Sequence, residues 1–198
     1  MLKVTISKGN KKMGEIKSVS LPPIKTCAKN CTCAKKCYAA KLCRIYKNVA
    51  QSYENNLMAY MESPIDYFNQ VKKAACTQKF FRWHVSGDIL NELYLYDMVR
   101  IAEELPGTDF LCFTKKYDLV NEFLNHKTIP DNLHIIFSEW EGMSMENPYN
   151  LPVAHVVFKG CEPLESWEIC QGNCLECALN GYGCWHMKKG DNVAFYEH

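Results

Sequence analysis

The spacing of apolar side chains divides the chain into alternating strands and helices. Short apolar runs between turn residues predict strands, and apolar positions that recur every three or four residues predict amphipathic helices. The helices expected on this basis are Lys36–Glu62, Pro64–Ala75, Asn91–Leu105 and Tyr117–Asn125. The expected strands are Leu2–Ser7, Lys79–Val85, Asp109–Thr114, Leu133–Ser138, Val153–Lys159 and Asn192–Tyr196. In the longest helix we expect a buried face made by Leu42, Ile45, Val49, Tyr53, Leu57 and Tyr60.

The repeat of strand and then helix predicts an α/β protein with a parallel sheet, since parallel neighbours need a crossover segment between them. Four to six such units are too few for a closed eight-stranded barrel. We therefore expect a partial (β/α) barrel of parallel strands, with an α/β layered sheet as the alternative. The 198 residues, of which 47% are apolar, can bury one core but leave no room for a second full domain.

The strand that starts near Phe80 has one polar face. Arg82, His84 and Ser86 alternate with aromatic or apolar side chains, whereas a strand buried on both faces is usually apolar throughout. We expect helices over the aromatic face and a concave site beneath the polar one. The segment Ser86-Gly87-Asp88 then lies at the carboxyl end of the strand, where α/β folds bind ligands.

Other expected strands also end in polar residues, namely Thr114-Lys115, Ser138-Glu139 and Lys159. A polar rim of this kind predicts a substrate site. The candidate catalytic residues are Arg82, His84 and Lys115, and the candidate cofactor-binding residues are Ser86, Gly87, Asp88, Ser138 and Glu139. The alternative is that strand ends are polar because they meet solvent and that His84 is a hydrogen-bonded core residue. The sequence gives no functional preference to His126, His134 or His155.

Nine of the twelve cysteines fall into two groups, Cys27, Cys31, Cys33, Cys37 and Cys43 near the start and Cys170, Cys174, Cys177 and Cys184 near the end. Thiolates are the soft ligands that iron–sulphur clusters and zinc select, and packing alone requires no such clustering. We therefore divide the chain into a barrel with a cluster-binding segment, residues 1–160, and a Cys-rich metal-binding extension, residues 161–198. The isolated Cys76 and Cys112 are expected to be buried as small apolar side chains.

The expected compartment favours metal binding over disulfides. Met1–Lys12 alternates apolar and basic residues instead of forming a secretory signal, and no apolar run approaches the length of a membrane span. We expect a cytoplasmic protein without a membrane partner. A reducing compartment favours metal thiolates, although an even number of cysteines keeps a disulfide framework as the alternative.

The C-terminal group has the spacing CxxxCxxCxxxxxxC, and Gly172, Gly181 and Gly183 permit tight turns there. Four thiolates in one loop make a closed site that suits either a second [4Fe-4S] cluster or tetrahedral zinc. His186 is a further candidate ligand, although it directly follows the tryptophan next to Cys184 and neighbouring side chains seldom reach one metal.

The net charge of +1 conceals an asymmetry along the chain. The first fifty residues carry twelve Lys and Arg against the single acid Glu15, a charge of +11, and the remainder carries −10. Such a segment could hold nucleic acid or another polyanion through phosphate contacts. Alternatively, its lysines compensate an anionic thiolate-bound cluster.

Several motifs together resemble the phage gene-product-88-like family, which has no settled activity. They are Ser20-Leu21-Pro22-Pro23, Cys27, Cys33, Cys37-Tyr38-Ala39, the strand FRWHVSGDI, the segment FLCFTKKY and the Cys-rich tail that ends in Cys184-Trp185 and His198. This resemblance spans nearly the whole chain and implies a phage or mobile-element origin. More distantly, the motifs resemble phage gene-product-37/68-like proteins and radical S-adenosylmethionine enzymes of the spore photoproduct lyase kind, which have partial barrels.

The resemblance implies that Cys27, Cys33 and Cys37 hold a [4Fe-4S] cluster, with Cys31 as the alternative to Cys33 and Cys43 as a packing residue. Their spacings of five and three residues differ from the CxxxCxxC of radical S-adenosylmethionine enzymes. Three ligands leave one iron open for S-adenosylmethionine. In that comparison, Ser86-Gly87-Asp88 stands where such enzymes bind the amino group of the methionine moiety.

Three function classes follow from these observations. The first is a radical S-adenosylmethionine-like iron–sulphur enzyme that acts on a nucleotide, a nucleic acid or another anionic substrate. The second is a metal-stabilised nucleic-acid-binding or regulatory protein without catalysis. The third is an electron-transfer or redox-sensing iron–sulphur protein, which would need a reducing partner. Polar groups along a concave face favour the first class.

Overall fold

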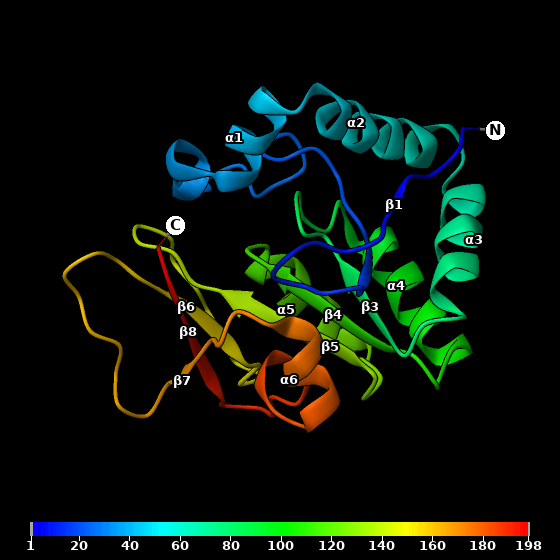
Figure 1. Ribbon diagram of the computed structural model, residues 1–198. Helices are drawn as coiled ribbons and strands as arrows, with labels where there is room; N and C mark the ends of the chain where they lie inside the picture. The colour runs from blue at the N-terminus through cyan, green and yellow to red at the C-terminus, as the bar shows by residue number, and fades with distance from the viewer. Residues whose placement is uncertain (1, 198) are drawn as a thin grey trace.

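The computed structural model describes residues 2–197 and is built around one sheet of eight strands (Figure 1). In sequence order the strands are β1 (Ile6–Ser7), β2 (Lys17–Val19), β3 (Phe80–Trp83), β4 (Asp109–Thr114), β5 (Leu133–Ser138), β6 (Val153–Val157), β7 (Glu168–Ile169) and β8 (Asn192–Tyr196). Their order across the sheet is β1-β2-β3-β4-β5-β6-β8-β7. Every neighbouring pair is parallel except β1 and β2. The prediction of an α/β protein with a parallel sheet is confirmed, and within residues 2–197 the sheet does not close into a barrel.

The helices are α1 (Tyr38–Ile45), α2 (Lys47–Glu62), α3 (Pro64–Ala75), α4 (Glu92–Glu104), α5 (Tyr117–His126) and α6 (Cys174–Asn180), with 3₁₀ turns η1 (Thr32–Lys36) and η2 (Gly183–Trp185). Helices α1, α3, α4 and α6 begin with a side-chain cap, whereas α2 and α5 do not. Ser63 accepts a hydrogen bond from the Asp66 amide at 3.3 Å, and Pro64 occupies the first turn of α3.

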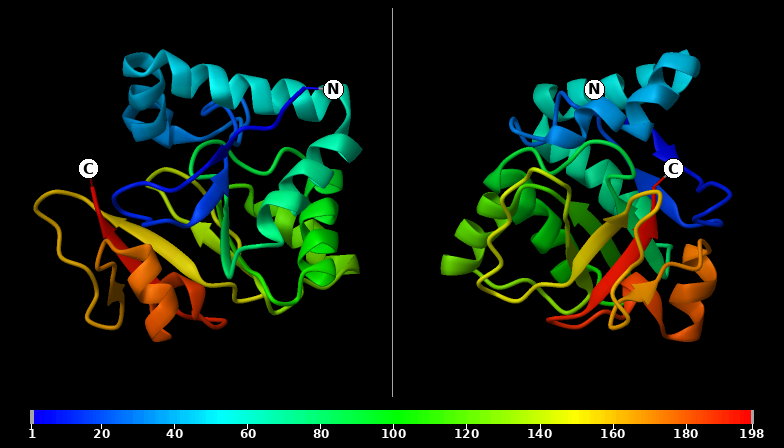
Figure 2. Two further views of the ribbon diagram at one scale, coloured as in Figure 1. Left: turned by 45° about the vertical axis from the view of Figure 1, so that its right-hand side comes forward. Right: turned by 90° about the vertical axis from the view of Figure 1, so that its left-hand side faces the viewer.

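The two faces of the sheet have different covers because side chains alternate along each strand. Helices α3, α4 and α5 cover one face, where Phe81, Trp83 and Phe110 belong to the main core. The opposite face carries a smaller core in which Phe80 packs against Trp185 of η2, with ring centroids 5.2 Å apart. Figure 2 shows α6 on the other side of the sheet from α4 and α5.

The expected helix Lys36–Glu62 is wrong as one element. Tyr46 adopts an extended backbone, with φ −106° and ψ 93°, and therefore ends α1 and precedes α2. The break turns the two segments independently, so that Leu57 is buried whereas Leu42 and Ile45 are exposed to solvent. The first strand is also shorter than expected, and β2 and β7 were not predicted, because two or three residues show no period.

The expected strand Lys79–Val85 is four residues long, because His84 has φ 52° and leaves the extended conformation. The chain then turns at Gly87, where φ is 79°. A Cβ atom at Gly87 would lie 2.6 Å from Thr26 Oγ1 and 2.8 Å from Leu21 Cβ. Glycine is therefore required both for the backbone conformation and for the close approach of the N-terminal segment.

We predict that Gly87→Ala lowers the free energy of unfolding by about 3 kcal/mol, since the left-handed backbone strain and the steric overlap add. The matched control is Gly160→Ala, because Gly160 has φ 87° but nothing within 4 Å of its Cβ position. This control should lose only about 1–2 kcal/mol. Urea unfolding of both variants measures the difference, and equal losses would show that the contact with Leu21 and Thr26 is not made.

Candidate metal and substrate site

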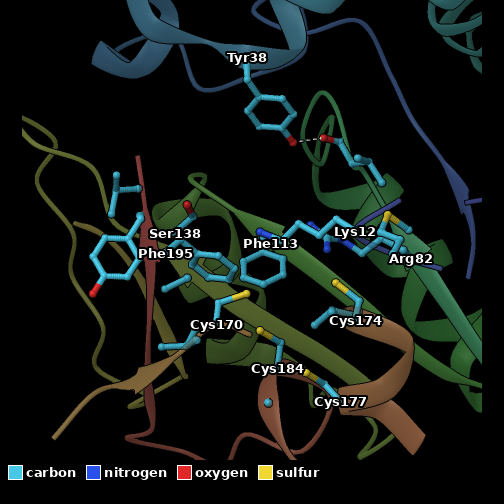
Figure 3. Close-up of a pocket in the computed structure, with 18 of the residues that line it drawn as sticks. Lys12, Tyr38, Arg82, Phe113, Ser138, Cys170, Cys174, Cys177, Cys184 and Phe195 are labelled. Atoms are coloured by element: carbon cyan, nitrogen blue, oxygen red, sulfur yellow. Dashed lines mark hydrogen bonds between the residues drawn. The ribbon is translucent and has the colours of Figure 1, made fainter. Parts of the chain in front are cut away.

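A cavity of about 440 Å³ lies on the sheet face opposite α3, α4 and α5. Its floor consists of side chains that point away from the main core, including Leu111, Phe113, Val156 and Phe195. Its size is in the range of small-molecule sites. Figure 3 shows Tyr38 of α1 on one side of this cavity and the C-terminal cysteines on the other.

The N-terminal cysteines lie at the carboxyl edge of the sheet, and two of them, Cys33 and Cys37, line the cavity. Cys37 precedes α1 and caps it, since its Sγ accepts a hydrogen bond from the Ala40 amide at 3.4 Å. A hydrogen bond from Cys33 lowers the pKa of Cys31 to about 6 and correspondingly raises that of Cys33. Burial raises the pKa of Cys27 to about 11, and nearby negative charges add to the rise. These thiols therefore interact with one another.

The C-terminal cysteines all line the cavity, although they come from three elements. Cys170 follows β7, Cys174 and Cys177 belong to α6, and Cys184 is in η2. Burial raises the pKa of Cys174, Cys177 and Cys184, the last to about 12. Their loop is tight, since a Cβ atom at Gly183 would lie 3.1 Å from Cys177 Cβ.

All twelve cysteines are free thiols, so the disulfide framework is not found. Within residues 2–197, no three His, Cys, Asp or Glu side chains are grouped so that they could hold a metal ion as they stand. Six of the thiols line the cavity, but no three of these described side chains converge on one point. The donor set nevertheless suits a soft metal, because the groups at both ends are sulphur. Trp185, whose ring lines the cavity, also has an indole N–H without a hydrogen-bond partner among the described residues.

Asp88 joins the carboxyl ends of β3 and β4. Its buried carboxylate accepts hydrogen bonds from Thr114 Oγ1 at 2.6 Å, the Lys115 amide at 3.0 Å and the Ile89 amide at 2.8 Å. Burial raises the pKa of Asp88, which these hydrogen bonds oppose. The Asp88 amide lies 3.3 Å from Thr26 Oγ1, so that the same turn also contacts the segment leading to Cys27.

Arg82 extends from β3 into the cavity. Its guanidinium stacks on Phe113, with 4.4 Å from Cζ to the ring centroid, and its Nε donates to the Trp83 carbonyl at 3.3 Å. Its charge also opposes the rise in the pKa of Cys174 and Cys184. Arg82 is therefore placed to bind an anion or to stabilise thiolates near the C-terminal end of the cavity.

Lys115 lies near the N-terminal cysteines, as Arg82 lies near the C-terminal ones. Its Nζ donates to the Ser138 carbonyl at 3.1 Å, makes a short hydrogen bond to Ser138 Oγ and lies 5.6 Å from the Trp140 ring centroid. Burial lowers the pKa of Lys115, and the negative charges of Cys33 and Cys31 oppose this decrease. The structure thus brings three of the candidate residues, Arg82, Lys115 and Ser138, into the lining of one cavity.

The other candidate residues do not line the cavity. His84 is buried in the main core, where its Nε2 lies 3.0 Å from the Tyr94 hydroxyl, so Arg82, His84 and Ser86 do not share one face as we expected. Ser86 is buried against the N-terminal segment, and its carbonyl accepts from the Leu21 amide at 2.9 Å. Glu139 points to the opposite face and contacts His155 Nδ1 at 2.5 Å.

The cysteines outside the two metal-ligand sets differ from one another. Cys112 is fully buried, as expected, whereas Cys76 is exposed, so that prediction was wrong. Cys76 follows the last turn of α3, beyond the apolar face of the helix, and its Sγ donates to the Lys73 carbonyl at 3.2 Å. Cys161 and Lys159 are also exposed, and Cys43 lies on α1 away from the cavity lining.

Sequence reasoning missed several residues of the cavity. Lys12 lies over Phe195, with its Nζ 4.8 Å from the ring centroid, and Lys36 pairs with Glu197 at 2.7 Å. Phe113 and Phe195 could have been found from strand alternation, since both share a face with other cavity residues. Lys12 carries no local signal because it belongs to the irregular segment between β1 and β2.

The fold and the cavity define an α/β protein with a mostly parallel open sheet and a thiol-lined, cationic cavity on one face. The protein-family model described as Gene product 88 matches residues 3–181. The chain therefore belongs to this family, as its motifs predicted. No curated protein and no solved structure matches the chain. No helix among residues 2–197 has the length and apolar character required to cross a membrane.

The position of His84 gives a pH prediction. Burial lowers the pKa of His84 to about 3, and the charges of Arg82 and Lys116 act in the same direction. Because the unfolded chain binds this proton near pH 6.5, the free energy of unfolding should fall as the pH drops from about 6.5 towards 3, by up to about 1.4 kcal/mol per pH unit. Urea unfolding across this pH range measures the slope.

His84→Asn should remove this part of the pH dependence, since asparagine tolerates the left-handed backbone but does not titrate. The matched control is His126→Asn, because His126 is exposed on α5 and should leave the slope unchanged. An unaltered slope in His84→Asn would contradict the buried, neutral state of this imidazole.

Proposed function

We propose that this protein is an iron–sulphur enzyme of radical S-adenosylmethionine-like type, with a partial-barrel sheet whose concave face binds an anionic substrate. One observation carries the proposal. Cys33 and Cys37 line the same cavity as four cysteines that follow more than 130 residues later, Cys170, Cys174, Cys177 and Cys184, and Arg82 and Lys115 also line it. Packing alone gives no reason for thiols to meet there, whereas ligation of soft metals does.

In this proposal Cys27, Cys33 and Cys37 hold a [4Fe-4S] cluster at the carboxyl edge of the sheet, and Cys170, Cys174, Cys177 and Cys184 hold a second cluster or zinc. Cys33 lines the cavity whereas Cys31 does not, which favours Cys33 as the second ligand. Binding requires the thiols to lose their protons, so metal uptake releases protons to solvent. A three-cysteine cluster supplies an electron and an open iron that S-adenosylmethionine can occupy.

The residues of the chain contribute binding and orientation. Arg82 and Lys115 attract an anionic group, and the aromatic rings beneath them limit the water around it. Ser138 fixes the ammonium of Lys115 through two oxygen atoms, its own hydroxyl and its carbonyl. Asp88 holds the backbone at the edge of β4 through the Lys115 amide, so that Lys115 and the N-terminal cysteines keep one relative position. A pocket with such groups favours an enzyme over a simple electron carrier.

Purified without oxygen, the protein should contain iron and acid-labile sulphide in near-equal amounts. Cys37→Ser should remove the first cluster and lower the iron content by about half if both sites hold clusters. Serine supplies a hydroxyl that can cap α1 in place of the Cys37 thiol, but it lacks the soft thiolate that binds iron. Metal and sulphide analysis with electron paramagnetic resonance measures both sites.

Cys43→Ser is the matched control for the first site, because Cys43 is on the same helix but outside the cavity lining. Cys184→Ser and Cys161→Ser form the corresponding pair for the second site. Both controls should keep their full metal content. A colourless protein that contains zinc alone would contradict the proposal.

Reduction with dithionite in the presence of S-adenosylmethionine should yield 5′-deoxyadenosine. Cys33→Ser should abolish this product, whereas Cys31→Ser should retain it, since Cys33 lines the cavity and Cys31 does not. Chromatography of the reaction mixture measures the nucleoside. The reverse pattern would assign the ligand to Cys31, and an iron-loaded wild-type protein that forms no product would contradict the use of S-adenosylmethionine.

A further inference from the structure

Helix α1 presents an unpartnered surface beside the cavity. Leu42 and Ile45 are three residues apart and therefore share one side of the helix, and Tyr38 and Tyr46 lie at its two ends. All four are exposed, and Ile45 is 68% exposed. Leu42 and Ile45 belong to the buried face that we expected from the sequence, yet both are exposed to solvent.

The same surface is strongly basic. The segment from residue 16 to residue 53 contains eight Lys and Arg and no acid. Lys41, Arg44 and Lys47 are exposed around the apolar stripe, and among residues 2–197 no carboxylate forms an ion pair with them. In contrast, Lys25 pairs with Glu54 at 2.7 Å. The positive charge of Lys41, Arg44 and Lys47 is therefore available to bind a polyanion.

The surface also leads into the cavity. Lys36, Cys37 and Tyr38, at the start of α1, are part of the cavity lining. The Tyr38 hydroxyl donates to the Val85 carbonyl at 2.6 Å, which holds this end of the helix against the turn that follows β3 (Figure 3). A chain molecule lying along α1 therefore reaches the mouth of the cavity.

We propose that α1 binds single-stranded nucleic acid and delivers one nucleotide to the cavity. Cations that follow a backbone, interleaved with aromatic rings on which bases stack, are the usual means of binding single strands. Tyr38 and Tyr46 stand at the two ends of an eight-residue helix, about 12 Å apart along its axis, with Lys41 and Arg44 between them. The chemistry at the cavity rests on the proposed function, whereas the binding step does not.

The test is fluorescence anisotropy of the full-length protein with labelled oligo-dT and oligo-U of about 12 nucleotides. If three cations contact phosphates, the logarithm of the association constant should fall with the logarithm of salt concentration with a slope of about −2. Lys41→Gln with Arg44→Gln should reduce that slope by about 1.4. Tyr46→Ala should weaken binding about tenfold, and Tyr46→Phe should restore it, because phenylalanine keeps the stacking ring.

The matched control combines Tyr96→Ala with Lys127→Gln. These two residues form an exposed aromatic and basic pair elsewhere on the surface, with Lys127 Nζ 5.9 Å from the Tyr96 ring centroid. Circular dichroism checks that all variants are folded. The control should bind like wild type.

Absence of oligonucleotide binding, binding without salt dependence, or equal losses in the α1 and control variants would overturn the proposal. Binding of poly-glutamate instead of oligonucleotides would assign the surface to an acidic protein and would also overturn it. The measurement is independent of the metal. A metal-free preparation that binds oligonucleotides supports this proposal even if the iron–sulphur function fails, and an iron-loaded protein that does not bind contradicts this proposal alone.

Discussion

The close contact between the N-terminal segment and the carboxyl ends of β3 and β4 positions the N-terminal cysteines and Lys115 at the candidate site. Gly87 leaves space for Leu21 and Thr26, and Asp88 accepts hydrogen bonds from Thr114 and from the Lys115 amide. The segment has no strand or α-helix of its own between β2 and α1, so these contacts define its course. Buried polar groups with several partners hold one arrangement, because each lost partner leaves a group unsatisfied.

Because side chains alternate along the parallel strands, residues that pack in the main core and residues that line the cavity lie on opposite faces of the sheet. One face belongs to the main core, and the other provides the aromatic floor on which Arg82, Lys115 and Lys12 each lie over a ring. Among residues 2–197 no carboxylate forms an ion pair with any of these three cations, so they remain available to an anion in this partly enclosed space. The two cysteine groups at opposite sides of this floor give the cavity its soft donors.

Strong periodicity made the larger part of the fold predictable. Strands β4 and β5 have the predicted bounds, and α3 begins at the predicted proline, because burial and capping act locally in the sequence. The break at Tyr46, the left-handed backbone of His84 and the two-residue β7 depend on tertiary contacts that no local pattern reports. Arg82 lies in a predicted strand and Lys115 directly follows one, so the sequence indicated both. Lys12 lies in an irregular segment and reaches the cavity through contacts with residues that are distant along the chain, so no local pattern indicated it.

The central proposal is that thiols from both ends of the chain hold metal at opposite sides of one cavity, with iron on the α1 side. Anomalous diffraction at the iron absorption edge, from crystals grown without oxygen, tests it most directly. The account predicts iron density bonded to Cys37 on the α1 side of the cavity, and either iron or zinc density within the Cys170–Cys184 loop. Cysteines on the α1 side that bind no iron, or that are bonded to one another, would contradict it.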